Sequence, residues 1–331
     1  MTGLDNARTR GTRHRDPNDG WLVDQHVAGG AWATSDCAPS LPATGMSART
    51  FAMMELMARP QRGRRYSARR TVRVSDAGPD GALRLDGVAR YLQDVATDDW
   101  VVSGLSTEGT WVVRRAYVEL ASGGCWPQYG EEVTAVTWCA GTGPAWAERR
   151  TDLEVGGQVA VRATALWVLV DKAGRPLRLD GSFHQVYGEA CGGRKASRRV
   201  PAAPTAGDLV APSVSSQPWV VRKADIDVVG HVNNAAIWSA VVEAAPAGLR
   251  AVDLVHHGPV DASSRVALCW WPGHLCLVAR VAGADGPGAA GPTVPGSSSL
   301  ARDAVSQGSD APQLVVTMSA VLSVSAGPVE E

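Results

Sequence analysis

Residues 222–231 read RKADIDVVGH, and residues 73–82, 149 positions earlier, read RVSDAGPDGA. Aligning the two stretches places Asp76 on Asp225 and Gly81 on Gly230. Each stretch joins a segment of strand-like composition to a segment whose apolar residues recur at helical spacing. The repeat indicates two copies of one structural module rather than two unrelated domains.

Outward from this repeat, both copies show the same order of predicted elements: a strand, a helix and then four strands. The predicted helices span 85–100 and 234–245. The predicted strands are 66–74, 110–120, 132–140, 145–155 and 159–171 in the first copy, and 217–224, 249–257, 265–271, 275–281 and 313–325 in the second. We therefore predict an α+β fold in which each module is one long helix wrapped by an antiparallel sheet. Two such modules can lie side by side and join their sheets, with a site at their interface.

The same patterns predict the domain boundaries. The N-terminal module is expected over 65–186 and the C-terminal module over 217–331. Residues 1–64 lack sustained periodicity and are expected to be a disordered leader or an overextended start. Residues 187–216, rich in Gly, Ala, Pro and Ser, are expected to be a linker, and 283–311 a disordered insertion.

The composition is that of an ordinary globular protein. The 331 residues are 45% hydrophobic and 20% charged, with a net charge of -1, which argues against nucleic-acid binding. The longest apolar runs, such as Ala165–Val170, fall far short of the ~20 residues of a membrane helix. We expect a cytoplasmic protein, because no secretion signal opens the chain. The cysteines lack Cys-x-x-Cys or zinc-like spacing, which predicts buried reduced thiols and no metal: Cys37, Cys125, Cys139, Cys191, Cys269 and Cys276.

The second copy carries the candidate chemistry. Asp227 and His231 lie four residues apart around a glycine, just before the predicted helix. A carboxylate beside an imidazole can orient the ring or share a proton transfer, and N–H groups at a helix start can polarise a carbonyl. Gly78 and Ala82 take these positions in the first copy, which is therefore expected to be chemically silent. The alternative is that Asp225 and Asp227 are turn residues and His231 is structural.

The stretch Asp225–Trp238, DIDVVGHVNNAAIW, resembles the D-x-D-x-x-G-H-V-N-N segment of hotdog-fold thioesterases. Together with Leu85–Asp98, Trp111–Glu119 and Ala163–Leu177, it makes the chain from 66 to 325 similar to the acyl-acyl-carrier-protein thioesterase family. The resemblance implies two tandem hotdog modules that hydrolyse fatty acyl-carrier protein in fatty acid biosynthesis. Water would be the nucleophile, no cofactor would be needed, and the partner would be the acidic acyl carrier protein.

On this resemblance, Asp227 and His231 are the expected catalytic residues. Asn233 and Asn234 are expected to cap the helix or to contact the substrate. The plant members have an asparagine where this chain has Val229. They also place a carboxylate or a cysteine on the strand after the helix, where residues 256–260 here read HHGPV. We therefore expect a simpler Asp/His site, in which at most one of the two histidines faces the substrate.

The silent copy is expected to line the acyl pocket. Four aromatic residues are candidates for its wall: Tyr91, Trp100, Trp111 and Trp238. The segment Arg59–Arg73 contains seven arginines and is a candidate docking surface for the acidic carrier.

Three other functions remain open from the sequence. The same pattern is compatible with an acyl-CoA thioesterase, a hotdog dehydratase, or a non-catalytic module that binds acyl thioesters. A tandem hotdog already contains two modules, so both a monomer and a homodimer are compatible with the pattern. No nucleic-acid or membrane partner is expected.

Overall fold

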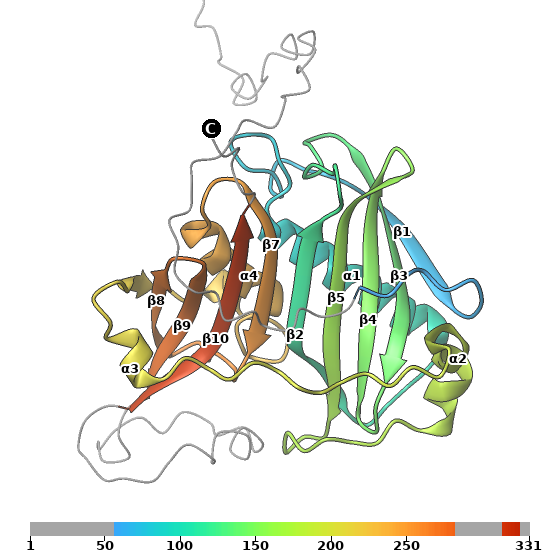
Figure 1. Ribbon diagram of the computed structural model, residues 1–331. Coiled ribbons are helices and arrows are strands. Elements are labelled where there is room, and N and C mark those ends of the chain that lie inside the picture. Colours follow the sequence, from blue (N-terminus) through green and yellow to red (C-terminus); the bar gives the residue numbers. More distant parts are fainter. Residues whose placement is uncertain (1–55, 282–312, 325–331) are drawn as a thin grey trace, which may run out of the picture. The chain divides into compact units, whose positions relative to one another are not determined.

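The computed structural model describes residues 56–281 and 313–324, all within one compact unit, Ser40–Glu331. Most of the expected leader and the whole of the expected insertion lie outside the described residues. The described strands form a single ten-stranded sheet in the order β1-β3-β4-β5-β2-β7-β10-β9-β8-β6 (Figure 1).

The two halves repeat the same elements. The first contains β1 (Arg65–Thr71), α1 (Leu85–Ser103), β2 (Thr110–Leu120), β3 (Glu132–Thr142), β4 (Trp146–Val155) and β5 (Gln158–Val170). The second contains β6 (Ser215–Trp219), α4 (Asn234–Ala244), β7 (Leu249–His256), β8 (Arg265–Trp271), β9 (His274–Val281) and β10 (Gln313–Val324). Read inward from either edge of the sheet, the strands follow the same sequence of equivalents. The predicted α+β fold with two helix-and-sheet modules is therefore confirmed.

The two modules join through their central strands. β2 pairs with β7 in antiparallel register, with Arg115 opposite Val255 and Tyr117 opposite Asp253. The Arg115 guanidinium donates two hydrogen bonds to the Asp253 carboxylate, and both residues are buried. Because each charge has a hydrogen-bonded partner, the join tolerates an ion pair that burial would otherwise penalise.

Helices α1 and α4 lie on the same face of the sheet and pack against each other (Figure 1). Their apolar faces and both halves of the sheet contribute to one main core, whose fully buried members include Val88, Leu153, Ala240, Leu254 and Leu277. α4 has 11 residues against 19 in α1, and it ends two residues before Pro246. Proline cannot continue a helix, which limits how far α4 covers the sheet.

Two further helices lie between the halves. α2 (Gly181–Cys191) was not expected, and it crosses the predicted linker boundary at 187. The Asp180 side chain caps it by accepting a hydrogen bond from the Phe183 N–H at 2.8 Å. Phe183 and Tyr187 pack into a second apolar cluster with Trp111.

The short helix α3 (Ala206–Leu209) lies near the other end of the predicted linker. Leu209 and Val214 pack against Cys269 and Cys276 in a third apolar cluster. The segment between α2 and α3 passes in front of the sheet in Figure 1, on the side away from α1 and α4. Both ends of the predicted linker are therefore packed, whereas the domain boundaries themselves stay predictions.

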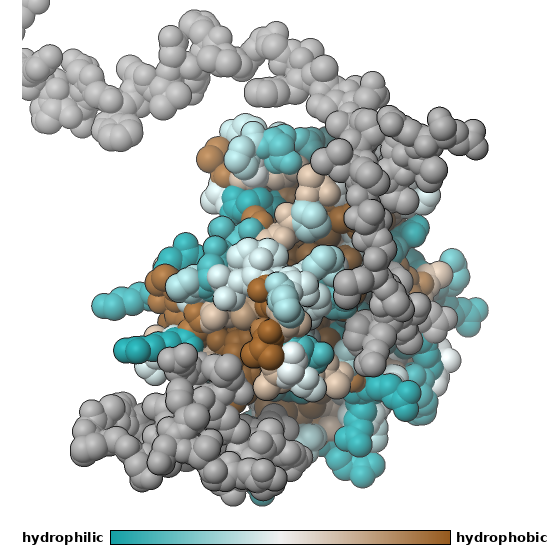
Figure 2. Space-filling view, turned by 60° about the vertical axis from the view of Figure 1, so that its left-hand side comes forward, coloured by the Kyte–Doolittle hydropathy of each residue, from teal (hydrophilic) through white to brown (hydrophobic). Residues whose placement is uncertain are grey.

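The surface of the second half mixes apolar and hydrophilic side chains. Figure 2 shows exposed apolar residues scattered among hydrophilic ones on the face that carries this half. Exposed valines occur in its loops at Val210, Val220, Val228 and Val229. Two of these, Val228 and Val229, belong to the repeated loop before α4.

Candidate functional site

A tight loop brings the backbones of Asp227 and His231 together. The Asp227 N–H donates to the His231 carbonyl at 2.9 Å, and the Gly230 N–H donates to the Asp227 carbonyl at 3.0 Å. Gly230 has a φ of +89°, in the left-handed region that favours glycine. Ile226 and Val232 form a β-bridge that closes the loop. The sequence D-V-V-G-H thus folds into a closed loop that begins with the acid, Asp227, and ends with the imidazole, His231.

The Asp227 carboxylate is fixed from two sides. One oxygen accepts a hydrogen bond from the Val229 N–H at 2.9 Å, and the other accepts from the Asn233 side-chain amide at 3.4 Å. In the part of the chain that the structure describes, this carboxylate forms no hydrogen bond with the His231 imidazole. The two residues are therefore neighbours through the backbone rather than a bonded side-chain pair.

Asn233 is the N-cap of α4. Its side-chain oxygen accepts from the Ala235 N–H at 2.8 Å, and its own N–H donates to the Asp225 carbonyl at 2.7 Å. Since its amide nitrogen also contacts Asp227, Asn233 links the helix start to the carboxylate. Asn234 is half-buried in the first turn, and its side chain forms no hydrogen bond with the described residues.

Sequence reasoning missed a carboxylate beside His231. The His231 Nε2 lies 3.5 Å from an Asp261 carboxylate oxygen, and the two residues also form a β-bridge. The side chains are 37% and 61% exposed, so this contact is open to water. Asp261 follows directly after the stretch 256–260, in which a carboxylate was looked for and not found. Extending the search by one residue into the loop after β7 would have identified it.

Asp225 serves the turn rather than the chemistry. It is 4% exposed, and its carboxylate accepts hydrogen bonds from the Arg222 backbone N–H and guanidinium. Its equivalent in the first half, Asp76, also accepts from the N–H three residues earlier, that of Arg73. The shared position is a structural element of both loops.

The first half contains the same loop without the acid and the imidazole. The Gly78 N–H donates to the Ala82 carbonyl at 2.8 Å, and the Gly81 N–H donates to the Gly78 carbonyl at 3.0 Å. The Leu83 N–H donates to the Pro127 carbonyl at 2.7 Å, as the Val232 N–H does to Val260 at 2.8 Å. The backbone is thus conserved between the copies, while the reactive side chains are present in one only.

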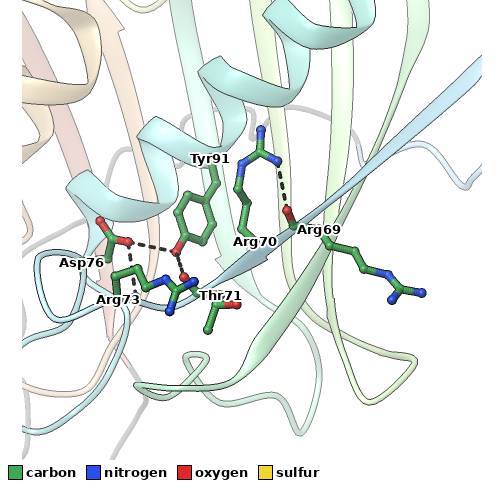
Figure 3. Close-up of a pocket in the computed structure, with 6 residues that line it drawn as sticks. All are labelled: Arg69, Arg70, Thr71, Arg73, Asp76 and Tyr91. Carbon is green, nitrogen blue, oxygen red and sulfur yellow. Dashed lines mark hydrogen bonds between the residues drawn. The ribbon is translucent and has the colours of Figure 1, made fainter.

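A polar cavity of about 340 Å³ lies beside the first loop (Figure 3). Its lining residues are Arg69, Arg70, Thr71, Arg73, Asp76 and Tyr91. The Tyr91 hydroxyl donates to the Asp76 carboxylate at 3.0 Å and lies 3.2 Å from the Thr71 carbonyl oxygen. Burial and the nearby Asp76 charge raise the pKa of Tyr91. The polar lining makes this cavity unsuitable for an acyl chain.

The four aromatic residues expected in an acyl pocket are divided between two clusters. Tyr91 and Trp238 are buried in the main core, whereas Trp100 and Trp111 make an edge-to-face contact in the second cluster. The structure therefore does not bring them together as one wall.

The arginines of 59–73 are partly engaged within the fold. Arg59 pairs with Asp152 and Glu154, Arg64 with Asp99 at 2.7 Å, and Arg70 with Asp98 at 2.7 Å. These contacts tie β1 and the segment before it to β4 and to α1. Fewer of the seven arginines are therefore available for docking than the sequence suggested.

Two classes of site are not found within the described ranges. No cluster of three His, Cys, Asp or Glu residues there is suited to hold a metal ion. None of the helices described is long and apolar enough to cross a membrane. Four of the cysteines in those ranges are buried, and Cys125 is exposed; Cys37 lies outside the described residues.

Comparison with known proteins identifies the family. The chain matches the acyl-ACP thioesterase N-terminal domain over residues 63–180 and the acyl-ACP thioesterase C-terminal domain over residues 212–261. Together the two matches cover about half of the chain, and the second includes the whole stretch from Asp225 to Asp261.

Individual relatives agree with this match. An uncharacterised protein of Mycobacterium tuberculosis is 27% identical over 195 residues, which are 57% of this chain and 74% of that protein. The chloroplastic oleoyl-acyl carrier protein thioesterase 1 of Arabidopsis thaliana is 26% identical over 207 residues. That alignment covers 56% of each chain, so this chain spans just over half of the plant protein.

The fold agrees as well. The 12:0-ACP thioesterase of Umbellularia californica superposes with a TM-score of 0.56 at 16% identity, covering 78% of this chain and 96% of that one. At this identity the likeness shows the fold, which is the tandem hotdog arrangement that the resemblance implied. On the family matches, the chain belongs to the acyl-acyl-carrier-protein thioesterase family, a family of thioester hydrolases.

Proposed function

We propose that this protein hydrolyses the thioester of fatty acyl-carrier protein and releases free fatty acid. The observation that carries the proposal is the loop before α4, which gathers Asp227, His231 and the cap residue Asn233 at a helix N-terminus. The equivalent loop of the first half has the same backbone without these side chains, so one catalytic centre per chain is proposed.

In the proposed mechanism, His231 accepts a proton from the attacking water. Asp261, 3.5 Å from the His231 Nε2, orients the ring and stabilises the imidazolium that forms. Asp227 is held by Val229 and Asn233 and positions the water or the thioester. The N–H groups of the first turn of α4 polarise the carbonyl and stabilise the developing oxyanion.

The test is release of free thiol by the full chain from matched acyl-carrier-protein and acyl-CoA substrates of C8 to C18. We expect His231→Ala to lower kcat by about 10²–10⁴-fold, the usual contribution of a general base. Asp227→Asn should also lose most of kcat, and Asp261→Asn should lose less because its carboxylate is exposed. His184→Ala, at an exposed position of α2, is the matched control.

The outcomes separate the competing functions. Release from the carrier-protein substrate that disappears in His231→Ala supports the proposal. Faster release from acyl-CoA would assign CoA as the carrier. Saturable binding of both substrates without release would make the chain a binding module and overturn the catalytic roles.

A further inference from the structure

An arginine at the centre of the sheet lacks a counter-ion. Arg114 is the extra residue of a β-bulge in β2, between Val113 and Arg115. Within the described part of the chain, its guanidinium forms no hydrogen bond or ion pair, and burial lowers its pKa. Arg114 is only partly buried, and a cation that is partly removed from water without an anion is less stable than a paired one, so this position favours binding of an anion.

Two histidines lie beside this cation. The β2–β7 pairing ends with Arg115 opposite Val255, and Arg114 and His256 are the next residues along the two strands, close enough for the Arg114 charge to act on both His256 and His257. His256 is 5% exposed, and its Nε2 has no hydrogen-bond partner among the described residues. The neighbouring His257 Nε2 lies 2.8 Å from the Ser319 hydroxyl.

Both histidines are uncharged at neutral pH. Burial, followed by the Arg114 charge, lowers the pKa of His256 to about 3 and that of His257 to about 4. The imidazoles therefore add hydrogen-bonding capacity to the position without adding a second positive charge. The buried His256 Nε2 and the nearby Arg114 guanidinium, neither hydrogen-bonded to a described residue, together offer hydrogen-bonding groups to a ligand.

A short stretch of chain connects this position to the candidate catalytic loop. Val260 follows His256 by four positions, and its carbonyl accepts from the Val232 N–H at 2.8 Å, so His256 and Val260 are within about 14 Å even if the chain between them is extended. Met318, which pairs with His256 across the sheet, belongs to the main core together with Val232 and Ala235 at the start of α4. His256 therefore lies at the end of the strand that leads to Val260 and Asp261, and Arg114 lies on the neighbouring strand.

The charge of the ligand follows from the reaction. Water attack on an uncharged acyl thioester breaks the carbon–sulfur bond and gives a carboxylate, a thiol and one proton. A guanidinium binds a carboxylate through two parallel N–H···O bonds but offers an uncharged carbonyl much less.

We infer that Arg114, with His256 beside it, binds the carboxylate of a fatty acid, so that the enzyme retains its own product and is inhibited by it. The inference rests on the proposed function for the identity of the acid. It adds a site that discriminates the product from the substrate by charge.

Calorimetric titration of the full chain at pH 7.5 tests this inference, with dodecanoate and 1-dodecanol as probes below their aggregation limits. We expect dodecanoate to bind at least 10-fold more tightly than the alcohol. Arg114→Met should remove that preference while leaving binding of the alcohol unchanged. Arg265→Met, at an exposed position of β8, should retain it.

Equal affinity of the native chain for the acid and the alcohol would overturn the inference, whatever the behaviour of the variants. A full preference retained by Arg114→Met would also overturn it. Preference that depends on Arg114 in a protein that cleaves no thioester would support the site and contradict the proposed function. Cleavage without any preference for the acid would contradict this inference alone.

Discussion

At the scale of single residues, Gly230 and Gly81 form a natural pair for comparison. Both occupy the repeated loop with φ of +89° and +79°. A Cβ at Gly230 would meet no atom within 4 Å, and one at Gly81 would lie 3.3 Å from the Gln128 side-chain oxygen. Substitution at either position therefore acts mainly through the backbone conformation and not through crowding.

We predict that Gly230→Ala and Gly81→Ala each lower the free energy of unfolding by about 1–2 kcal/mol, the cost of a left-handed conformation. Only Gly230→Ala should reduce kcat, because it displaces the backbone between Asp227 and His231. Urea unfolding and thiol release measure the two effects. Equal loss of activity in both variants would contradict a chemically silent first copy.

The lowered pKa of His256 predicts how the free energy of unfolding depends on pH. Its pKa is lowered to about 3 in the fold, so its neutral form is favoured there. This contribution is complete above the unfolded pKa of about 6.5 and is lost as the pH falls toward 3. Between pH 6 and pH 4, His256 should lower the free energy of unfolding by about 1.4 kcal/mol for each unit by which the pH falls. We expect His256→Gln to remove this part of the pH dependence.

Urea unfolding at intervals of half a pH unit measures this slope. His184→Gln, which changes an exposed imidazole, should leave the slope as in the native chain. If the free energy of unfolding of His256→Gln declined with falling pH as steeply as that of the native chain, protonation of this histidine would not be the cause of the decline.

At the scale of elements, the join between β2 and β7 depends on Arg115 and Asp253. Asp253→Ala leaves a buried guanidinium without its carboxylate and should lower the free energy of unfolding by about 3–5 kcal/mol. Replacing both residues, with Arg115→Met and Asp253→Leu, should recover most of that loss. Glu132→Ala, which removes the exposed partner of Arg69, should have a much smaller effect. Urea unfolding measures all of these variants, and equal losses in Asp253→Ala and Glu132→Ala would contradict the prediction.

The elements that the sequence predicted well are those with strong periodicity. The starts of α1 and α4 and the central strands agree with the pattern, because apolar spacing directly reflects which side is buried. The predicted strand 217–224 is instead β6 at Ser215–Trp219, followed by a short 3₁₀ turn at Lys223–Asp225. Local turn chemistry around Asp225 ended the strand earlier than its composition indicated.

Helix α2 was missed because its sequence, GSFHQVYGEAC, contains two glycines and several residues of low helix propensity. Its stability comes from the Asp180 cap and from packing of Phe183 and Tyr187 against the sheet. Asp261 was missed because the search for a carboxylate stopped at residue 260, and because its proximity to His231 arises from a β-bridge across 30 positions, which apolar spacing does not indicate.

At the scale of the whole described unit, one core serves both halves. The main cluster includes side chains of α1 and α4, which pack against each other over the joined sheet. Cutting the chain between the halves would expose the sides on which α1 and α4 pack against each other, together with the edges of β2 and β7.

We therefore predict that residues 1–200 and 201–331, produced separately, lack cooperative unfolding transitions. When mixed they should regain a single transition, because the shared core and the β2–β7 pairing form again. Circular dichroism during thermal unfolding measures both states. A cooperative transition in either fragment alone would contradict the dependence of the halves on each other.

The repeated loop has a consequence for the evolution of this chain. A backbone scaffold that persists with glycine and alanine in place of the acid and the imidazole does not depend on them for its shape. A second reactive centre would need aspartate at Gly78, histidine at Ala82, asparagine at Arg84 and aspartate at Gln128, with a shift of the Asp80 side chain to admit the first. Duplication has thus left two copies of one loop: the side chains of the second are constrained by chemistry, whereas those of the first are free to change, and four substitutions separate it from the same set of side chains.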